Sequence, residues 1–103
     1  MENMERTEMD KLIAYLYKKY EADESKDVLV KPCCGGLQVI VTDKDDNWLW
    51  DAVCHPHSYG GKRGLIEVME QTKNNYVLTE EERECDDVLG YLTAEDIIKR
   101  LES

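Results

Sequence analysis

The side chains best suited to chemistry are three cysteines and two histidines that fall in one stretch of the chain. They are Cys33, Cys34, Cys54, His55 and His57. Thiolate sulfur and imidazole nitrogen together form the ligand set that zinc prefers. A further cysteine, Cys85, is far enough along the chain to add a ligand only if the fold brings it back.

The segments around these residues indicate how they would meet. In residues 37–42 and 48–54, side chains that share a face recur at every second position, as in strands. A short polar loop separates the two segments, which predicts an antiparallel hairpin. If Thr42 faces Trp48, the same register places Gly36 opposite Cys54, Gly35 opposite His55 and Cys33 opposite His57. Directly opposed side chains have Cβ atoms about 4.5–5.5 Å apart. This register predicts a zinc-stabilised domain in which the ligands come from Cys33, Cys34, Cys54 and His57.

The leading expectation is nevertheless that the chain has no metal and no cofactor. The two cysteines at 33 and 34 are adjacent, whereas zinc frameworks space them as Cys-x-x-Cys. Free cysteines in a reducing compartment are also ordinary small core residues. No third group that would orient a Cys–His nucleophile is identifiable, and the glycines at 60, 61 and 64 do not form a phosphate-binding loop. We therefore expect no catalytic residues and a protein that is not an enzyme.

Charge indicates a class of partner. The 103 residues include 23 acids and 13 bases, a formal net charge of −10. Direct binding of nucleic acid needs clustered Lys and Arg, and a membrane span needs about 20 apolar residues, so neither partner is expected. Spaced carboxylates can instead occupy a basic groove on a protein. The candidate partner-binding acids are Glu80, Glu81, Glu82, Glu84, Asp86 and Asp87, with Asp43, Asp45 and Asp46 on the hairpin.

Periodicity predicts an α+β fold in a single domain spanning residues 1–103. A small antiparallel sheet of three or four strands should carry N-terminal, middle and C-terminal helices. Trp48 and Trp50 should share its core-facing side, because they are two residues apart on one strand. The expected helices span 8–20, from 62 or 63 to 74 or 75, a turn or two from 79, and the segment after Thr93. The expected strands span 28–31, 37–42, 48–54 and 76–78, while 88–92 fits either a strand or a loop.

Two segments carry a resemblance. Tyr59-Gly60-Gly61 leading into residues 64–69, followed by Gly90 to Asp96, resembles small uncharacterised proteins of Gram-positive gut bacteria and their phages. In size, acidity and helix–hairpin–helix layout, the chain is also similar to phage-encoded anti-CRISPR inhibitors. This similarity concerns general properties and no shared sequence motif, so it assigns no functional residue in this chain. It implies a phage or mobile-element protein that inhibits a nucleic-acid-handling host protein, such as a CRISPR nuclease.

The N-terminal segment is charged and lacks the apolar core of a signal peptide, which predicts a cytoplasmic location. The resulting expectation is a cytoplasmic, non-enzymatic, acidic inhibitor that binds a host protein with a basic surface. The zinc-stabilised domain stands as the alternative. The sequence does not specify an oligomeric state.

Overall fold

The computed structural model describes residues 7–70, 76–85 and 88–103, and the side chains of 83–85 are not described. The helices are α1 (Glu8–Tyr20), α2 (Glu80–Cys85) and α3 (Ala94–Glu102), with a 3-10 turn, η1, at Gly61–Arg63. The strands are β1 (Lys26–Cys33), β2 (Gly36–Asp43), β3 (Trp48–Cys54), β4 (Ile66–Met69) and β5 (Val88–Leu92). The α+β class is confirmed, but the sheet has five strands instead of three or four.

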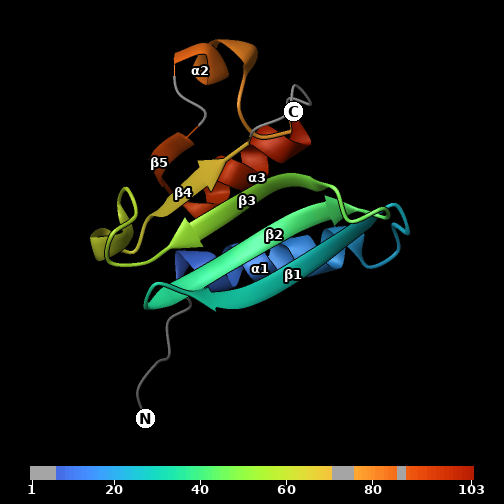
Figure 1. The fold of residues 1–103 in the computed structure, drawn as a ribbon, viewed down its shortest axis with the longest axis horizontal. Coiled ribbons are helices and arrows are strands. Elements are labelled where there is room, and N and C mark those ends of the chain that lie inside the picture. Colours follow the sequence, from blue (N-terminus) through green and yellow to red (C-terminus); the bar gives the residue numbers. More distant parts are fainter. Residues whose placement is uncertain (1–6, 71–75, 86–87) are drawn as a thin grey trace.

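The sheet is an antiparallel meander in which every strand pairs with the next one along the chain. Helices α1 and α3 lie side by side behind it and cover one face, whereas α2 lies beyond its β4–β5 side (Figure 1). We call the surface under α1 and α3 the covered face. The opposite surface, which faces the viewer in Figure 1, is the open face.

Both long helices begin as the sequence predicts. Thr7 and Asp10 form a reciprocal capping box at α1, and Thr93 and Asp96 form another at α3. Each box satisfies two backbone N–H groups that the first turn leaves without helical partners. Among the described residues, no helix has the length and apolar content needed to cross a membrane.

Alternate residues of the strands fill the space between the covered face and the helices. Val39, Trp50 and Val68 are fully buried there, against Leu12 of α1 and other helix side chains. The full core also contains Met9, Leu16, Val41, Leu49, Ala52, Ile66, Val77, Leu92, Ala94 and Ile97. The apolar side chains of the first and last helices therefore form the core together with the sheet.

The helix predicted from residue 62 or 63 is wrong. The chain makes the single turn η1 and then enters β4, in which Ile66 and Val68 are buried while Glu67 and Met69 are less so. That alternation has the two-residue period of a strand. Gly64 ends η1 in the left-handed conformation, with φ at 76°, which stops a helix from continuing. The predicted end of that helix, at 74 or 75, lies outside the described residues.

A buried carboxylate shapes the segment after β4. Glu70 is fully buried, and its two carboxylate oxygens accept hydrogen bonds from the backbone N–H groups of Tyr76, Val77 and Leu78 at 2.8–3.0 Å. Residues 76–78 therefore form a bend instead of the predicted short strand. The short helix predicted from residue 79 is confirmed as α2, and residues 88–92 are a strand, β5.

Candidate binding groove and thiol cluster

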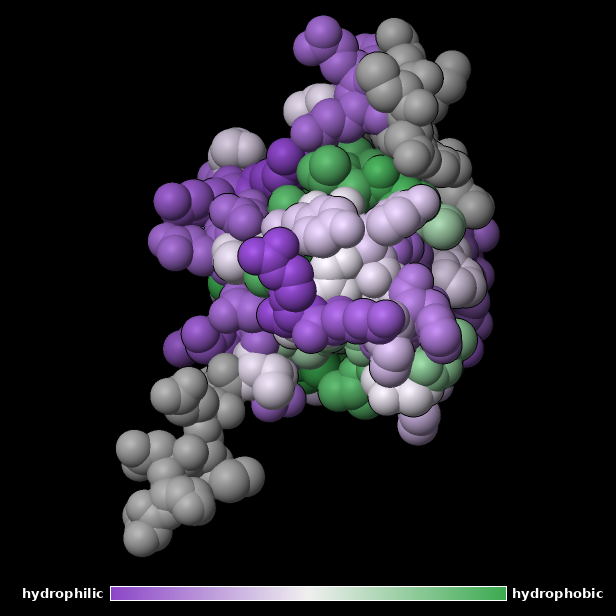
Figure 2. All heavy atoms as spheres, turned by 90° about the vertical axis from the view of Figure 1, so that its left-hand side faces the viewer, coloured by the Kyte–Doolittle hydropathy of each residue, from purple (hydrophilic) through white to green (hydrophobic). Residues whose placement is uncertain are grey.

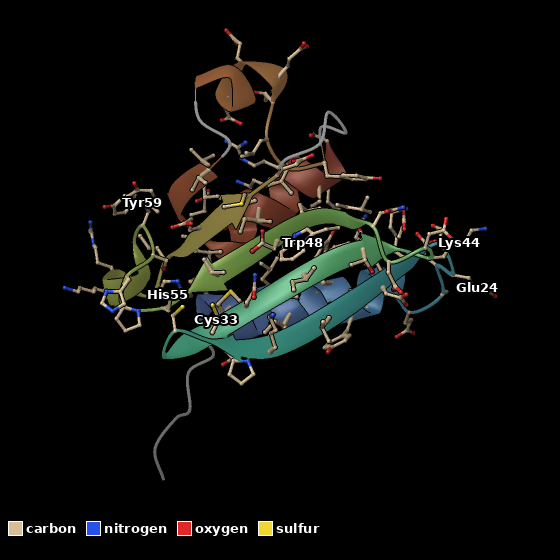
Figure 3. The ribbon with its side chains drawn as sticks, in the orientation of Figure 1. Glu24, Cys33, Lys44, Trp48, His55 and Tyr59 are labelled. Carbon is tan, nitrogen blue, oxygen red and sulfur yellow. The ribbon has the colours of Figure 1, made fainter. Side chains whose placement is uncertain are left out.

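A groove of about 340 Å³ lies on the open face, over the middle of β3. Its walls come from β2, β3, β4 and the segment after β3, and Trp48 and His55 lie at separate positions along it (Figure 3). The lining residues are Gln38, Trp48, Asp51, Val53, His55, Glu67 and Met69. The groove thus combines an aromatic wall, two carboxylates, an imidazole and a thioether.

A β-bulge turns Trp48 toward this groove. Thr42 pairs with Trp48 as predicted, but Val41 pairs with Trp50, so β3 has one extra residue between the two pairs. Such a residue bends the strand and re-aims the side chain before it. Trp50 is fully buried on the covered face, whereas Trp48 is 50% exposed on the open face. The prediction that both tryptophans pack in the core is correct for Trp50 and wrong for Trp48.

Asp51 forms the acidic floor of the groove. It is buried, and its Oδ2 accepts a hydrogen bond from Gln38 Nε2 at 2.8 Å. Burial raises the pKa of the Asp51 carboxyl and the nearby Glu67 carboxylate adds to the rise, while hydrogen bonds from Gln38 and Trp48 oppose it. Glu67 is held in place because its Oε1 accepts the backbone N–H of Tyr59 at 2.7 Å. Two fixed carboxylates beside an indole can hold a cationic group.

At the β1–β2 turn, two thiols and one imidazole form what we call the thiol cluster, made of Cys33, Cys34 and His55. The two Sγ atoms are 3.4 Å apart, and each residue offers one ligand atom that lies within 4.8 Å of the others. Cys33 and His55 are labelled at this end of the sheet in Figure 3. Hydrophilic side chains dominate the surface here, with small hydrophobic patches between them (Figure 2). None of the cysteines with described side chains, Cys33, Cys34 and Cys54, forms a disulfide.

The thiol cluster shares only Cys33 and Cys34 with the predicted zinc ligands. The bulge shifts the hairpin register by one residue, so Cys54 pairs with Leu37 instead of Gly36. Cys54 packs against the core of the covered face, and His57 lies beyond the group of close ligand atoms. Those two predicted ligand positions are therefore not brought to the thiols, and His55 takes their place.

Several of the predicted partner-binding acids have structural partners. Asp43 Oδ1 accepts the backbone N–H groups of Asp45 and Asn47, each at 2.9 Å, and these bonds with the Asn47 side chain lower its pKa. Glu82 pairs with Arg100 at 2.7 Å, which with other hydrogen bonds lowers the pKa of Glu82 to about 2. Asp43 therefore shapes the hairpin loop, and Glu82 joins α2 to α3.

The remaining acids are divided between two places. Asp45 and Asp46 are exposed at the tip of the β2–β3 hairpin, while Glu80 and Glu81 are exposed on α2. The hairpin tip and α2 lie at different ends of the molecule (Figure 1). Asp86 and Asp87 lie outside the described residues, and the side chains of Glu84 and Cys85 are not described.

Sequence reasoning missed the groove acids Asp51 and Glu67. One signal was present, since Asp51 interrupts an otherwise apolar strand between Trp50 and Ala52. Aspartate is depleted in strands, so its presence at this position needs a physical explanation. No comparable signal marked Glu67, because its segment was assigned to a helix.

Comparisons with known proteins identify no relative. Protein-family models, curated proteins and solved structures each give no match to the chain. The chemistry that the groove and the thiol cluster can support follows from their own residues.

Proposed function

We propose that this chain is a non-enzymatic protein-binding protein whose open-face groove receives a lysine or arginine side chain from a basic protein partner. The observation that carries the proposal is the half-exposed indole of Trp48 beside two carboxylates, Asp51 and Glu67. An indole face attracts a cation through its quadrupole, and a carboxylate adds charge-assisted hydrogen bonds. Arginine and tryptophan are also the side chains most often found at the energetic centres of protein interfaces.

The charges around the groove support a basic partner. The exposed acids Asp45 and Asp46 lie three and two residues before Trp48 at the hairpin tip, so they extend the acidic character of the groove along the same hairpin. The whole chain carries −10. Such a field accelerates encounter with a positively charged protein and repels nucleic acid.

The partner class that fits this chemistry is a nucleic-acid-handling protein, whose own binding surface is basic. The chain would then act as an inhibitor by occupying that surface. A CRISPR nuclease is the first candidate for a direct assay, and Glu80 and Glu81 on α2 would provide a second, separate contact.

The test has two stages. Immobilised chain is used to capture proteins from a host lysate, and the captured protein is purified for kinetic measurement. We expect a basic partner whose binding weakens steeply with salt, since exposed charges are screened within about 10 Å at 0.1 M, and whose nucleic acid competes. Trp48→Ala should raise Kd by about 10-fold or more, as at other aromatic interface anchors.

Matched variants distinguish the effect of charges near Trp48 from the effect of the net charge of the chain. Asp45→Asn/Asp46→Asn removes two charges beside Trp48 and suits the left-handed backbone of Asp46, where φ is 64°. Glu95→Gln/Glu102→Gln removes two charges from α3, on the covered side. The hairpin pair should slow association more than the α3 pair, because nearby charges act mainly on encounter. Equal binding by the parent and Trp48→Ala would reject the groove as the binding site.

A further inference from the structure

The proposed function leaves the thiol cluster without a role. Its donors come from two segments, the β1–β2 turn and the residues after β3, and the ligand atoms of Cys33, Cys34 and His55 lie within 4.8 Å of one another. Cys34 is exposed and Cys33 and His55 are partly buried, so the cluster is open to ions from solvent. Two sulfurs and one imidazole nitrogen select borderline and soft metals over Mg²⁺ and Ca²⁺.

The backbone holds the two segments together. Cys34 and Gly35 are the central residues of the two-residue turn, with φ at 54° and 88°. Such turns favour Asn, Asp or Gly at both positions, so a cysteine at 34 is unusual. At Gly36, a Cβ would lie 2.0 Å from Cys54 O and 2.8 Å from His55 Cα. The absence of a side chain at Gly36 lets the turn approach His55 closely.

We propose that Cys33, Cys34 and His55 bind one zinc ion, with an open fourth position facing solvent. Zinc takes sulfur at about 2.3 Å in tetrahedral geometry, which places two sulfur ligands about 3.8 Å apart. The observed separation is 3.4 Å, and a small rotation of the exposed Cys34 side chain closes the difference. Three protein ligands with one open position is the arrangement of zinc sites that exchange a ligand.

Binding has a local consequence that can be observed. In the structure, His55 Nδ1 accepts the backbone N–H of His57 at 3.1 Å. Coordination through Nδ1 replaces that bond. Coordination through Nε2 leaves the proton on Nδ1, which then cannot accept a hydrogen bond from the His57 amide. Either mode frees the His57 amide, so zinc should move the amide resonance of His57 in an NMR titration.

The first measurement uses purified full chain, reduced, with Zn²⁺ and with Co²⁺ as a spectroscopic substitute. We expect one zinc per chain, and with cobalt a thiolate charge-transfer band together with the visible bands of tetrahedral coordination. Cys33→Ser, Cys34→Ser and His55→Ala should each weaken zinc binding by more than the roughly 10–100-fold cost of losing an outer-shell partner.

The control variants are Cys54→Ser and His57→Ala, which remove the same side-chain types just outside the cluster. Both should bind zinc as the parent does. If these controls lose binding while His55→Ala keeps it, the ligand set proposed here is wrong. Absence of stoichiometric zinc in the folded parent chain would also overturn the proposal.

A second measurement is independent of whether the variants fold. The parent chain is alkylated with and without zinc, and the modified cysteines are identified by mass spectrometry. Zinc should protect Cys33 and Cys34 and leave the modification of Cys54 unchanged. Equal alkylation of Cys34 in both conditions would contradict the site. Neither measurement involves the protein partner, so failure of the zinc site and failure of the partner-binding proposal are distinguishable.

Discussion

The two faces of the sheet are built from alternate residues of the same strands, yet they have different chemistry. On the covered face, Val39, Trp50 and Ala52 are completely buried under α1 and α3. On the open face, Leu29 is 54% exposed, Trp48 is 50% exposed and Asp51 is buried with a raised pKa. Apolar burial provides most of the folding free energy, so the covered face stabilises the fold. The open face retains groups that are costly for stability, which is typical of a binding surface.

The largest expected effect is a difference in the free energy of unfolding between variants of the two tryptophans of β3. Trp50→Ala should lower the free energy of unfolding by about 3–5 kcal/mol, because it removes a fully buried aromatic side chain and leaves a cavity. Trp48→Ala, at a half-exposed position, should cost about 1 kcal/mol or less. Urea unfolding of both variants tests this difference. Equal destabilisation would show that the open face also forms part of the core.

A smaller effect concerns Glu82, whose partner Arg100 belongs to α3. The lowered pKa of Glu82, about 2 against an ordinary 4.5, means that the folded chain favours the ionised carboxylate. Its contribution is complete above about pH 4.5 and is lost as the pH falls toward 2. Glu82→Gln should therefore cost about 1 kcal/mol at pH 7, since the pair is partly exposed, and this cost should disappear as the pH falls below 2. Melting temperatures of parent and variant across this range should converge at acidic pH.

The smallest effect should have the opposite sign. The raised pKa of Asp51 means that ionisation opposes folding, so the penalty is absent below the ordinary value of 3.8 and complete above the raised value. Asp51→Asn removes that penalty and can keep the contact with Gln38. We expect the variant to be more stable than the parent by about 0.5 kcal/mol at neutral pH and equally stable at low pH. A variant that is less stable at every pH would contradict a functional interpretation of this acid.

Much of the fold could be predicted because local signals agree with the tertiary structure. Thr7 with Asp10, and Thr93 with Asp96, form capping boxes recognisable from residue type and spacing alone. The central hairpin follows from alternation and a polar loop. The error at residues 66–69 has a physical cause. Four residues are too few to separate a two-residue period from a helical one, and Leu65, Ile66 and Met69 also fit a helix.

The candidate site was predicted less well because it depends on one inserted residue. The pair Thr42 and Trp48 was placed correctly, but the bulge beyond it changes every later pairing by one position. Neither residue type nor spacing marks a bulge between Trp48 and Trp50. Its position decides which tryptophan is exposed and which histidine meets the thiols. The sequence thus indicated the side-chain types of the thiol cluster and its two cysteines, Cys33 and Cys34, but not the histidine that lies beside them.

The contact between α1 and α3 determines when the chain can finish folding during synthesis. Ala94 at the start of α3 donates its backbone N–H to Glu8 Oε1 at 2.7 Å, and Tyr15 of α1 donates its hydroxyl to Glu102 of α3. All five strands leave the ribosome before α3, but until it emerges, the sheet half that α3 covers remains open to water. A nascent chain stalled before residue 94 should therefore expose apolar surface that chaperones recognise.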